Sequence, residues 1–148
     1  EINPFPNQQI FFSSYHYLQP YYILNRSYVT NLEEDWDILL ICAIARTEYL
    51  EDYLESRVKS VKTLEYADHH FFTEFDVAHL KRNFEALKSD KKLIITTEKD
   101  AMRLEMHRNF LLEHKIPVFV LPVEVIFHFN EGEAFNDLVR NFLLNFKA

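Results

Sequence analysis

From Asp37 onward, short apolar runs alternate with stretches in which apolar residues recur at helical spacing. The run Ile38–Ala45 contains no polar residue, which is typical of a strand buried on both faces of a parallel sheet. The same pattern predicts three further strands, with an edge strand after the last of them. Their ranges are 59–66, 92–96 and 116–121, and the edge strand is predicted over 123–129.

Amphipathic segments follow these strands and predict helices. One is predicted over residues 48–58, and the last runs from Glu133 to Lys147. Two others are predicted to begin at Thr73 and at Thr97, since each threonine is followed three residues later by an aspartate, as in a helix cap. The last helix has a continuous apolar stripe of Phe135, Leu138, Val139, Phe142, Leu143 and Phe146.

Alternation of strands and helices implies right-handed crossovers and a mostly parallel sheet. We therefore predict a three-layer α/β/α fold with about four to five strands over residues 37–148. Residues 1–36 are rich in Tyr, Phe and Pro and carry only short β-prone runs. They are predicted to form a linker or extended arm that precedes this domain.

In parallel sheets of this kind, binding and chemistry are located at the carboxyl ends of the strands. Three polar clusters are expected there: Arg46-Thr47, Asp68-His69-His70 and Thr97-Glu98-Lys99-Asp100. A carboxylate beside imidazoles can orient a general base or bind a metal. The same tripeptide can also be a polar loop before a helix, the third cluster can be a capped helix start, and Arg46 can be a solvated surface residue.

Composition removes several classes of function. The chain has 148 residues and a net charge of −7, which disfavours nucleic acid and unaided binding to anionic lipid. Its one glycine, Gly132, cannot build a Walker A loop or a dinucleotide fingerprint, because both need several glycines for close approach of the backbone to phosphate. The single cysteine, Cys42, lies in an apolar run and suits a reducing, cytoplasmic compartment.

No metal site is predicted either. Adjacent histidines seldom converge on one ion, and the other histidines lack ligand spacing. A manganese phosphoesterase with an Asp-His-His motif would also need aspartates after other strands to hold two metals. Asp35 and Asp37 precede their strand, so this class is a minor alternative.

Five segments resemble the tetraacyldisaccharide 4′-kinase family of lipid A synthesis. Residues 95–104 are similar to its T-T-E-K-D-A-x-R-L block, and residues 66–71 to its F-P-D-H-H/Y segment. Residues 41–46 resemble its T-G-I-A-N-P segment, residues 121–125 its L-P-I-E-V strand, and residues 9–13 its lobe junction. Ala43 and Ala45-Arg46-Thr47 stand in place of the family's glycine and Asn-Pro, and Ala67 replaces its proline, so the turn after the first strand is expected to differ in shape.

The resemblance implies that residues 37–148 are the C-terminal lobe of a kinase and that 1–36 lead from its junction with an N-terminal lobe. That lobe would bind ATP and Mg²⁺ and contact most of the lipid. The implied reaction phosphorylates the 4′-hydroxyl of tetraacyldisaccharide 1-phosphate at the cytoplasmic face of the Gram-negative inner membrane, with only peripheral membrane contact. The absence of an initiator methionine before Glu1 agrees with a fragment, which is expected to be inactive alone.

By position in the motif, His69 is the implied catalytic histidine, paired with an aspartate of the other lobe, and Asp68 supports it. His70, Arg46, Thr97, Glu98, Lys99 and Asp100 are the candidates for lining the site, and none is expected to bind nucleotide or metal. A different hypothesis is a non-catalytic binding domain that has kept the α/β fold of the family. Finding a Walker A loop upstream in the same reading frame would separate the two.

Overall fold

The computed structural model describes residues 2–6 and 8–146, which form two compact units. The larger unit spans Leu18–Pro122 and contains a six-stranded sheet with helices. The smaller unit consists of the chain up to Tyr17 and from Val123 onward. We describe each unit by itself.

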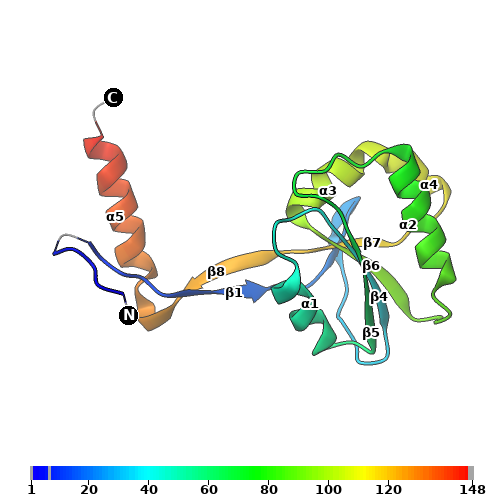
Figure 1. Cartoon of the computed structure of the whole chain (residues 1–148), viewed down its shortest axis with the longest axis horizontal. Coiled ribbons are helices and arrows are strands. Elements are labelled where there is room, and N and C mark those ends of the chain that lie inside the picture. The colour runs from blue at the N-terminus through cyan, green and yellow to red at the C-terminus, as the bar shows by residue number, and fades with distance from the viewer. Residues whose placement is uncertain (1, 7, 147–148) are drawn as a thin grey trace. The chain divides into compact units, whose positions relative to one another are not determined.

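The larger unit is an α/β/α sandwich, as predicted (Figure 1). Its strands follow the order β3-β2-β7-β6-β4-β5, in which β4, β5, β6 and β7 are parallel and β2 and β3 are antiparallel. The strands are β2 (Tyr21–Tyr22), β3 (Asn25–Val29), β4 (Asp37–Cys42), β5 (Ser60–Glu65), β6 (Lys92–Thr97) and β7 (Val118–Leu121). The helical segments are α1 (Glu48–Glu55), α2 (Glu74–Ala86), α3 (Glu98–Leu104), the 3₁₀ turn η1 (Glu105–His107) and α4 (Arg108–Glu113).

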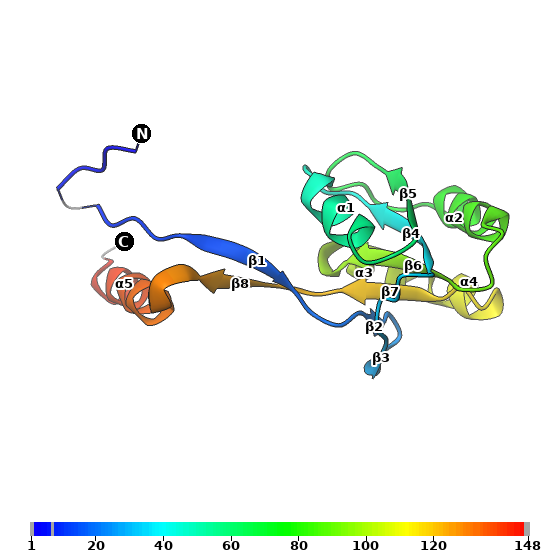
Figure 2. The ribbon, with the colours of Figure 1, turned by 90° about the horizontal axis from the view of Figure 1, so that it is seen from below.

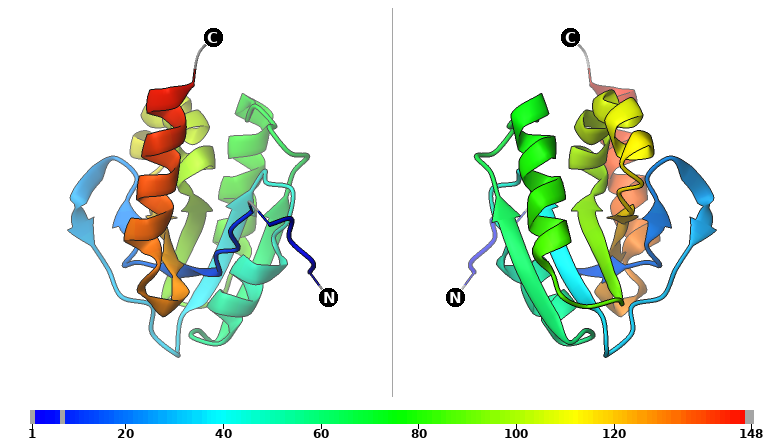
Figure 3. Two further views of the ribbon diagram at one scale, coloured as in Figure 1. Left: turned by 90° about the vertical axis from the view of Figure 1, so that its left-hand side faces the viewer. Right: turned by 90° about the vertical axis from the view of Figure 1, so that its right-hand side faces the viewer.

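Helices cover both faces of this sheet (Figure 3). The crossover from β4 to β5 places α1 on one face, whereas α2, α3 and α4 lie on the other. Strand β4 is central, and its residues Ile38–Cys42 are completely buried, which confirms the prediction from their unbroken apolar run. Burial raises the pKa of the Cys42 thiol to about 12, so this thiol stays protonated and unreactive.

Two short strands of the larger unit were not predicted as part of the sheet. β2 and β3 extend it from the β7 edge and bring the total to six strands (Figure 2). β2 has only two residues, which is too short for a recognisable alternation of apolar and polar positions. Both strands lie within residues 1–36, and the division of the chain at residue 36 stays a prediction.

The smaller unit contains a two-stranded antiparallel ribbon, β1 (Ser13–Tyr17) and β8 (Val123–Phe127). The 3₁₀ turn η2 (His128–Asn130) and helix α5 (Gly132–Asn145) follow. The prediction of 123–129 as an edge strand of the main sheet was wrong, because β8 pairs with β1. The last helix is confirmed, although Lys147, its predicted end, lies outside the described residues.

Candidate functional site at the switch point of the sheet

The candidate site lies at the carboxyl ends of β4, β5 and β6. After β4 the chain turns to α1 on one face, and after β6 it turns to α3 on the other, so neighbouring strands lead in opposite directions. Such a switch point is where open α/β sheets bind their ligands. The third segment of the site, Asp68-His69-His70, follows β5.

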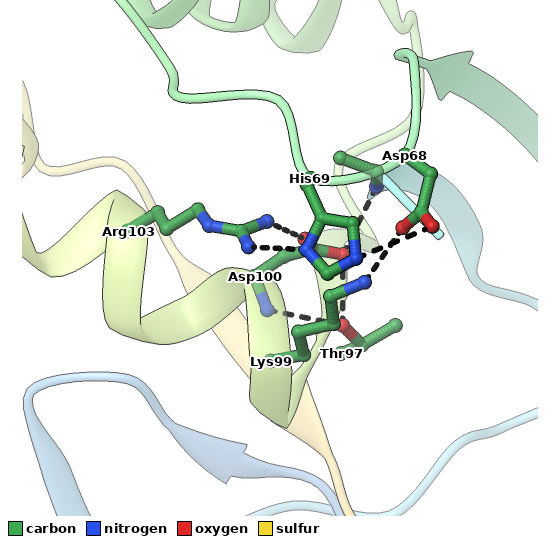
Figure 4. A network of polar contacts seen from close by, with 7 residues as sticks. Asp68, His69, Thr97, Lys99, Asp100 and Arg103 are labelled. Carbon is green, nitrogen blue, oxygen red and sulfur yellow. Dashed lines mark hydrogen bonds and ion pairs between the residues drawn. The ribbon is translucent and has the colours of Figure 1, made fainter. Parts of the chain in front are cut away.

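Asp100 holds the switch point together (Figure 4). Its carboxylate is completely buried and accepts a hydrogen bond from the backbone N–H of Ala43, 3.0 Å away, just after β4. It also accepts from the Thr97 hydroxyl at 2.8 Å, and its second oxygen pairs with Arg103 at 3.4 Å. Asp100 therefore ties the end of β4 to the beginning of α3 and is a structural centre rather than a free acid.

Thr97 is the N-cap of α3, as its spacing to Asp100 predicts. Its hydroxyl oxygen accepts a hydrogen bond from the Asp100 N–H at 3.1 Å. The second predicted cap is also confirmed, since Thr73 and Asp76 form a full capping box at the start of α2. Both caps satisfy backbone donors that would otherwise lack a partner in the first turn.

Replacing Thr97 with alanine is expected to lower the free energy of unfolding by about 1 kcal/mol, because the N-cap acceptor is lost. Urea unfolding of the 148-residue chain measures this loss. Thr97→Ser keeps the hydroxyl and serves as the control, with stability close to that of the wild type. An unchanged midpoint for Thr97→Ala would contradict the capping role.

The two histidines of the Asp-His-His segment have different surroundings. The side chain of His69 is 71% exposed, with Asp68 Oδ2 3.5 Å from its Nε2. Its backbone has φ 64°, the left-handed region that few residues other than glycine adopt, and its N–H bonds the carbonyl of Ala43 at 3.3 Å. The loop thus holds His69 at the sheet edge and leaves its ring accessible.

His70 instead turns toward the fold. Its Nε2 lies 2.9 Å from Asp76 Oδ2, and its ring stacks on Tyr66 with centroids 4.8 Å apart. Burial raises the pKa of Asp76, but hydrogen bonds from the Thr73 backbone and from His70 outweigh it and leave that pKa below its usual value. His70 therefore supports the capping box of α2.

Lys99 and Asp68 form an ion pair that joins the third cluster to the second. Lys99 Nζ lies 2.6 Å from Asp68 Oδ1, and this hydrogen bond is the main cause of a lowered pKa for Asp68, with the nearby His69 adding to it. Asp68 is therefore a carboxylate at neutral pH. Its second oxygen is the one that faces His69.

Two predicted candidates lie apart from these contacts. Arg46 is exposed in the loop between β4 and α1, and Glu98 is exposed on the first turn of α3. Conversely, the prediction omitted Arg103, which contacts both Asp100 and His69. Its spacing of three residues from Asp100 on a helix is a signal that could have found it.

The carboxylates near the switch point have cationic partners within the chain itself. Within the described ranges, no three His, Cys, Asp or Glu side chains come together in a way that could hold a metal. The carboxylates of Asp68 and Asp100 are already engaged by Lys99 and Arg103. A phosphate loop would further need glycines, and Gly132, in α5, is the only one in the sequence.

Fold and site together define a doubly wound α/β unit with a polar network at its switch point. Comparison with known proteins then gives the family: the model for tetraacyldisaccharide-1-P 4′-kinase matches residues 7–143. The chain belongs to this family, and it corresponds to the C-terminal part of its members. No solved structure matches the chain.

Several tetraacyldisaccharide 4′-kinases are similar to the chain. The protein from Bacteroides fragilis is 34% identical over 141 residues, which cover 91% of this chain and 38% of the relative. The one from Phocaeicola vulgatus is 33% identical over 146 residues, covering 97% and 40%. The one from Flavobacterium psychrophilum is 30% identical over 135 residues, covering 91% and 36%. The chain thus spans well under half the length of these relatives.

Proposed function

We propose that this chain is the C-terminal lobe of an ATP-dependent kinase that phosphorylates the 4′-hydroxyl of tetraacyldisaccharide 1-phosphate in lipid A biosynthesis. ATP and Mg²⁺ are bound by an N-terminal lobe, as the poor fit of both to the present lobe supports. The observation that carries the proposal is the exposed His69 at the switch point, in a chain whose relatives are named 4′-kinases.

In this proposal His69 takes part in catalysis, and Asp68 Oδ2 lies 3.5 Å from its Nε2. Exposure of the ring and its position on a loop tied to β4 let it face a group brought by the other lobe. In the complete site, His69 pairs with an acidic residue of that lobe, and this pair activates the sugar hydroxyl. His70, held by Asp76, is a support of the fold.

A genetic test is direct. In a Gram-negative strain depleted of its own 4′-kinase, the complete protein is expected to restore growth, and its His69→Ala variant is expected to fail at equal expression. Restoration by both would show that His69 is dispensable. Failure of both, with folded protein present, would favour the non-catalytic binding domain or the less favoured manganese phosphoesterase.

The 148-residue chain alone is expected neither to hydrolyse ATP nor to bind it tightly, because it offers no amide nest for the phosphates and Lys99 is engaged by Asp68. Titration calorimetry with Mg-ATP should show no saturable binding below millimolar concentrations. A micromolar dissociation constant would contradict the assignment of the nucleotide site to the other lobe.

The N-terminal lobe is also the proposed partner of α5. Five residues of the apolar stripe are exposed, with fractions between 39% and 67%: Leu138, Val139, Phe142, Leu143 and Phe146. A contiguous apolar surface of this kind marks an interaction site. The relatives, which are more than twice as long, supply the chain that could cover it.

Phe142→Asp tests this contact. Phe142 is 64% exposed, so the substitution should leave the melting temperature of the 148-residue chain nearly unchanged. In the complete protein it should lower that temperature, because a charge would be buried at the contact. An equal effect in both proteins would exclude α5 as part of the contact between lobes.

The proposed location is the cytoplasmic face of the inner membrane, with peripheral contact. Throughout the ranges that the structure covers, no helix has the length and apolar character needed to cross a bilayer. The lipid substrate named for the relatives supports a location at the membrane surface.

A further inference from the structure

The two ring nitrogens of His69 face groups of opposite charge (Figure 4). Nη2 of Arg103 lies 3.3 Å from Nδ1, and Asp68 Oδ2 lies 3.5 Å from Nε2. A guanidinium is always charged and has only donors, so Nδ1 must accept through its lone pair. A neutral imidazole then carries its one proton on Nε2, the nitrogen that lies 3.5 Å from the Asp68 carboxylate.

Arg103 is itself firmly held. Its other terminal nitrogen, Nη1, lies 3.4 Å from Oδ1 of the buried Asp100, and its side chain is only 15% exposed. The guanidinium also lies over the ring of Phe71, 5.4 Å from the centroid. The guanidinium of Arg103 thus contacts both the buried carboxylate of Asp100 and the exposed imidazole of His69.

The opposite side of the ring is fixed in a comparable way. Asp68 is held by Lys99 at 2.6 Å, and the backbone of His69 is bonded to Ala43, the same residue whose N–H binds Asp100. Ala43, at the end of β4, therefore bonds both the backbone of His69 and the carboxylate of Asp100. A side chain that is 71% exposed would otherwise sample both tautomers and several rotamers.

We propose that Arg103 is a positioning residue that fixes His69 as the tautomer protonated on Nε2. Nε2, the nitrogen that faces Asp68, is then a hydrogen-bond donor suited to an acidic group, while the lone pair of Nδ1 is occupied by Arg103. Only the consequence for catalysis rests on the proposed function: His69 would hold and orient a carboxylate of the other lobe rather than remove a proton itself in its neutral form.

The tautomer is read by long-range ¹H–¹⁵N correlation NMR of the 148-residue chain, at a pH where the imidazoles are neutral. A His69→Gln variant assigns the signal among the seven histidines. In the wild type, the shifts of His69 should be those of a single species protonated on Nε2. In Arg103→Lys, one ammonium cannot serve both Asp100 and His69, so these shifts should move to the average of two exchanging tautomers.

Arg103→Met should give the same averaged shifts, and if it fails to fold, Arg103→Lys decides, since it keeps a cation for Asp100. Lys99→Gln is the matched control: it removes the cation that holds Asp68 but keeps the contact between Arg103 and Nδ1, so the tautomer should stay unchanged. Averaged shifts in the wild type, or wild-type shifts in Arg103→Lys, would overturn the proposal. The measurement needs neither ATP nor lipid, so its failure is distinct from failure of the proposed kinase activity.

Discussion

Replacing His69 with alanine is expected to lower the turnover of the complete kinase by about 10²–10⁴-fold, the range for disrupting a positioned acid–base pair of which His69 is one member. The melting temperature should change little, because the ring is 71% exposed and its contacts lie at the surface. The measurement is steady-state 4′-kinase activity, with melting curves of the same preparations. His69→Asn is a useful second variant, since asparagine tolerates the left-handed backbone found at this position.

His70→Ala is the matched comparison. It removes the contact with Asp76 and the stacking on Tyr66, so it should cost stability, about 1 kcal/mol, and little turnover. Asp68→Ala should be intermediate in turnover, because it orients the His69 ring. Near-normal turnover of His69→Ala with loss in His70→Ala would mean that the other histidine reacts.

Replacing Asp100 with alanine is expected to cost about 3–5 kcal/mol of unfolding free energy, as when one partner of a buried ion pair is removed. The substitution leaves the Ala43 N–H without its acceptor and Arg103, 15% exposed, without its counter-charge. Urea unfolding of the 148-residue chain, followed by circular dichroism, gives the value. The loss should exceed that of Thr97→Ala several-fold.

Glu85→Ala is the control for this experiment. Glu85 pairs with Lys81 on α2 at 3.5 Å, but its side chain is 61% exposed. Exposed pairs contribute little, so its loss should stay within about 0.5 kcal/mol. Equal effects of the two substitutions would show that burial does not determine the contribution of Asp100.

Local features of the fold could be predicted from the sequence. The unbroken apolar run at 38–45 indicated the central strand, and the spacing of Thr73 to Asp76 and of Thr97 to Asp100 indicated the caps. These features depend on residues within one turn or one strand. The position of the polar clusters after the strands followed from the topology of parallel sheets.

What escaped prediction depends on contacts between distant residues. β8 has an apolar pattern compatible with the main sheet, and only its pairing with β1, more than one hundred residues earlier, assigns it to the smaller unit. Arg103 reaches His69 across 34 positions. The different partners of His69 and His70 could not be predicted either, since His69 contacts Arg103 and His70 contacts Asp76 on another helix.

The most direct measurement of the central claim is transfer of labelled γ-phosphate from ATP to tetraacyldisaccharide 1-phosphate by the complete protein, with the phosphorylated position identified by mass spectrometry and ³¹P NMR. The expected product carries a new phosphomonoester on the 4′-oxygen, at a rate that falls about 10²–10⁴-fold in His69→Ala. A folded complete protein that forms no such product, or that phosphorylates another position, would contradict the account.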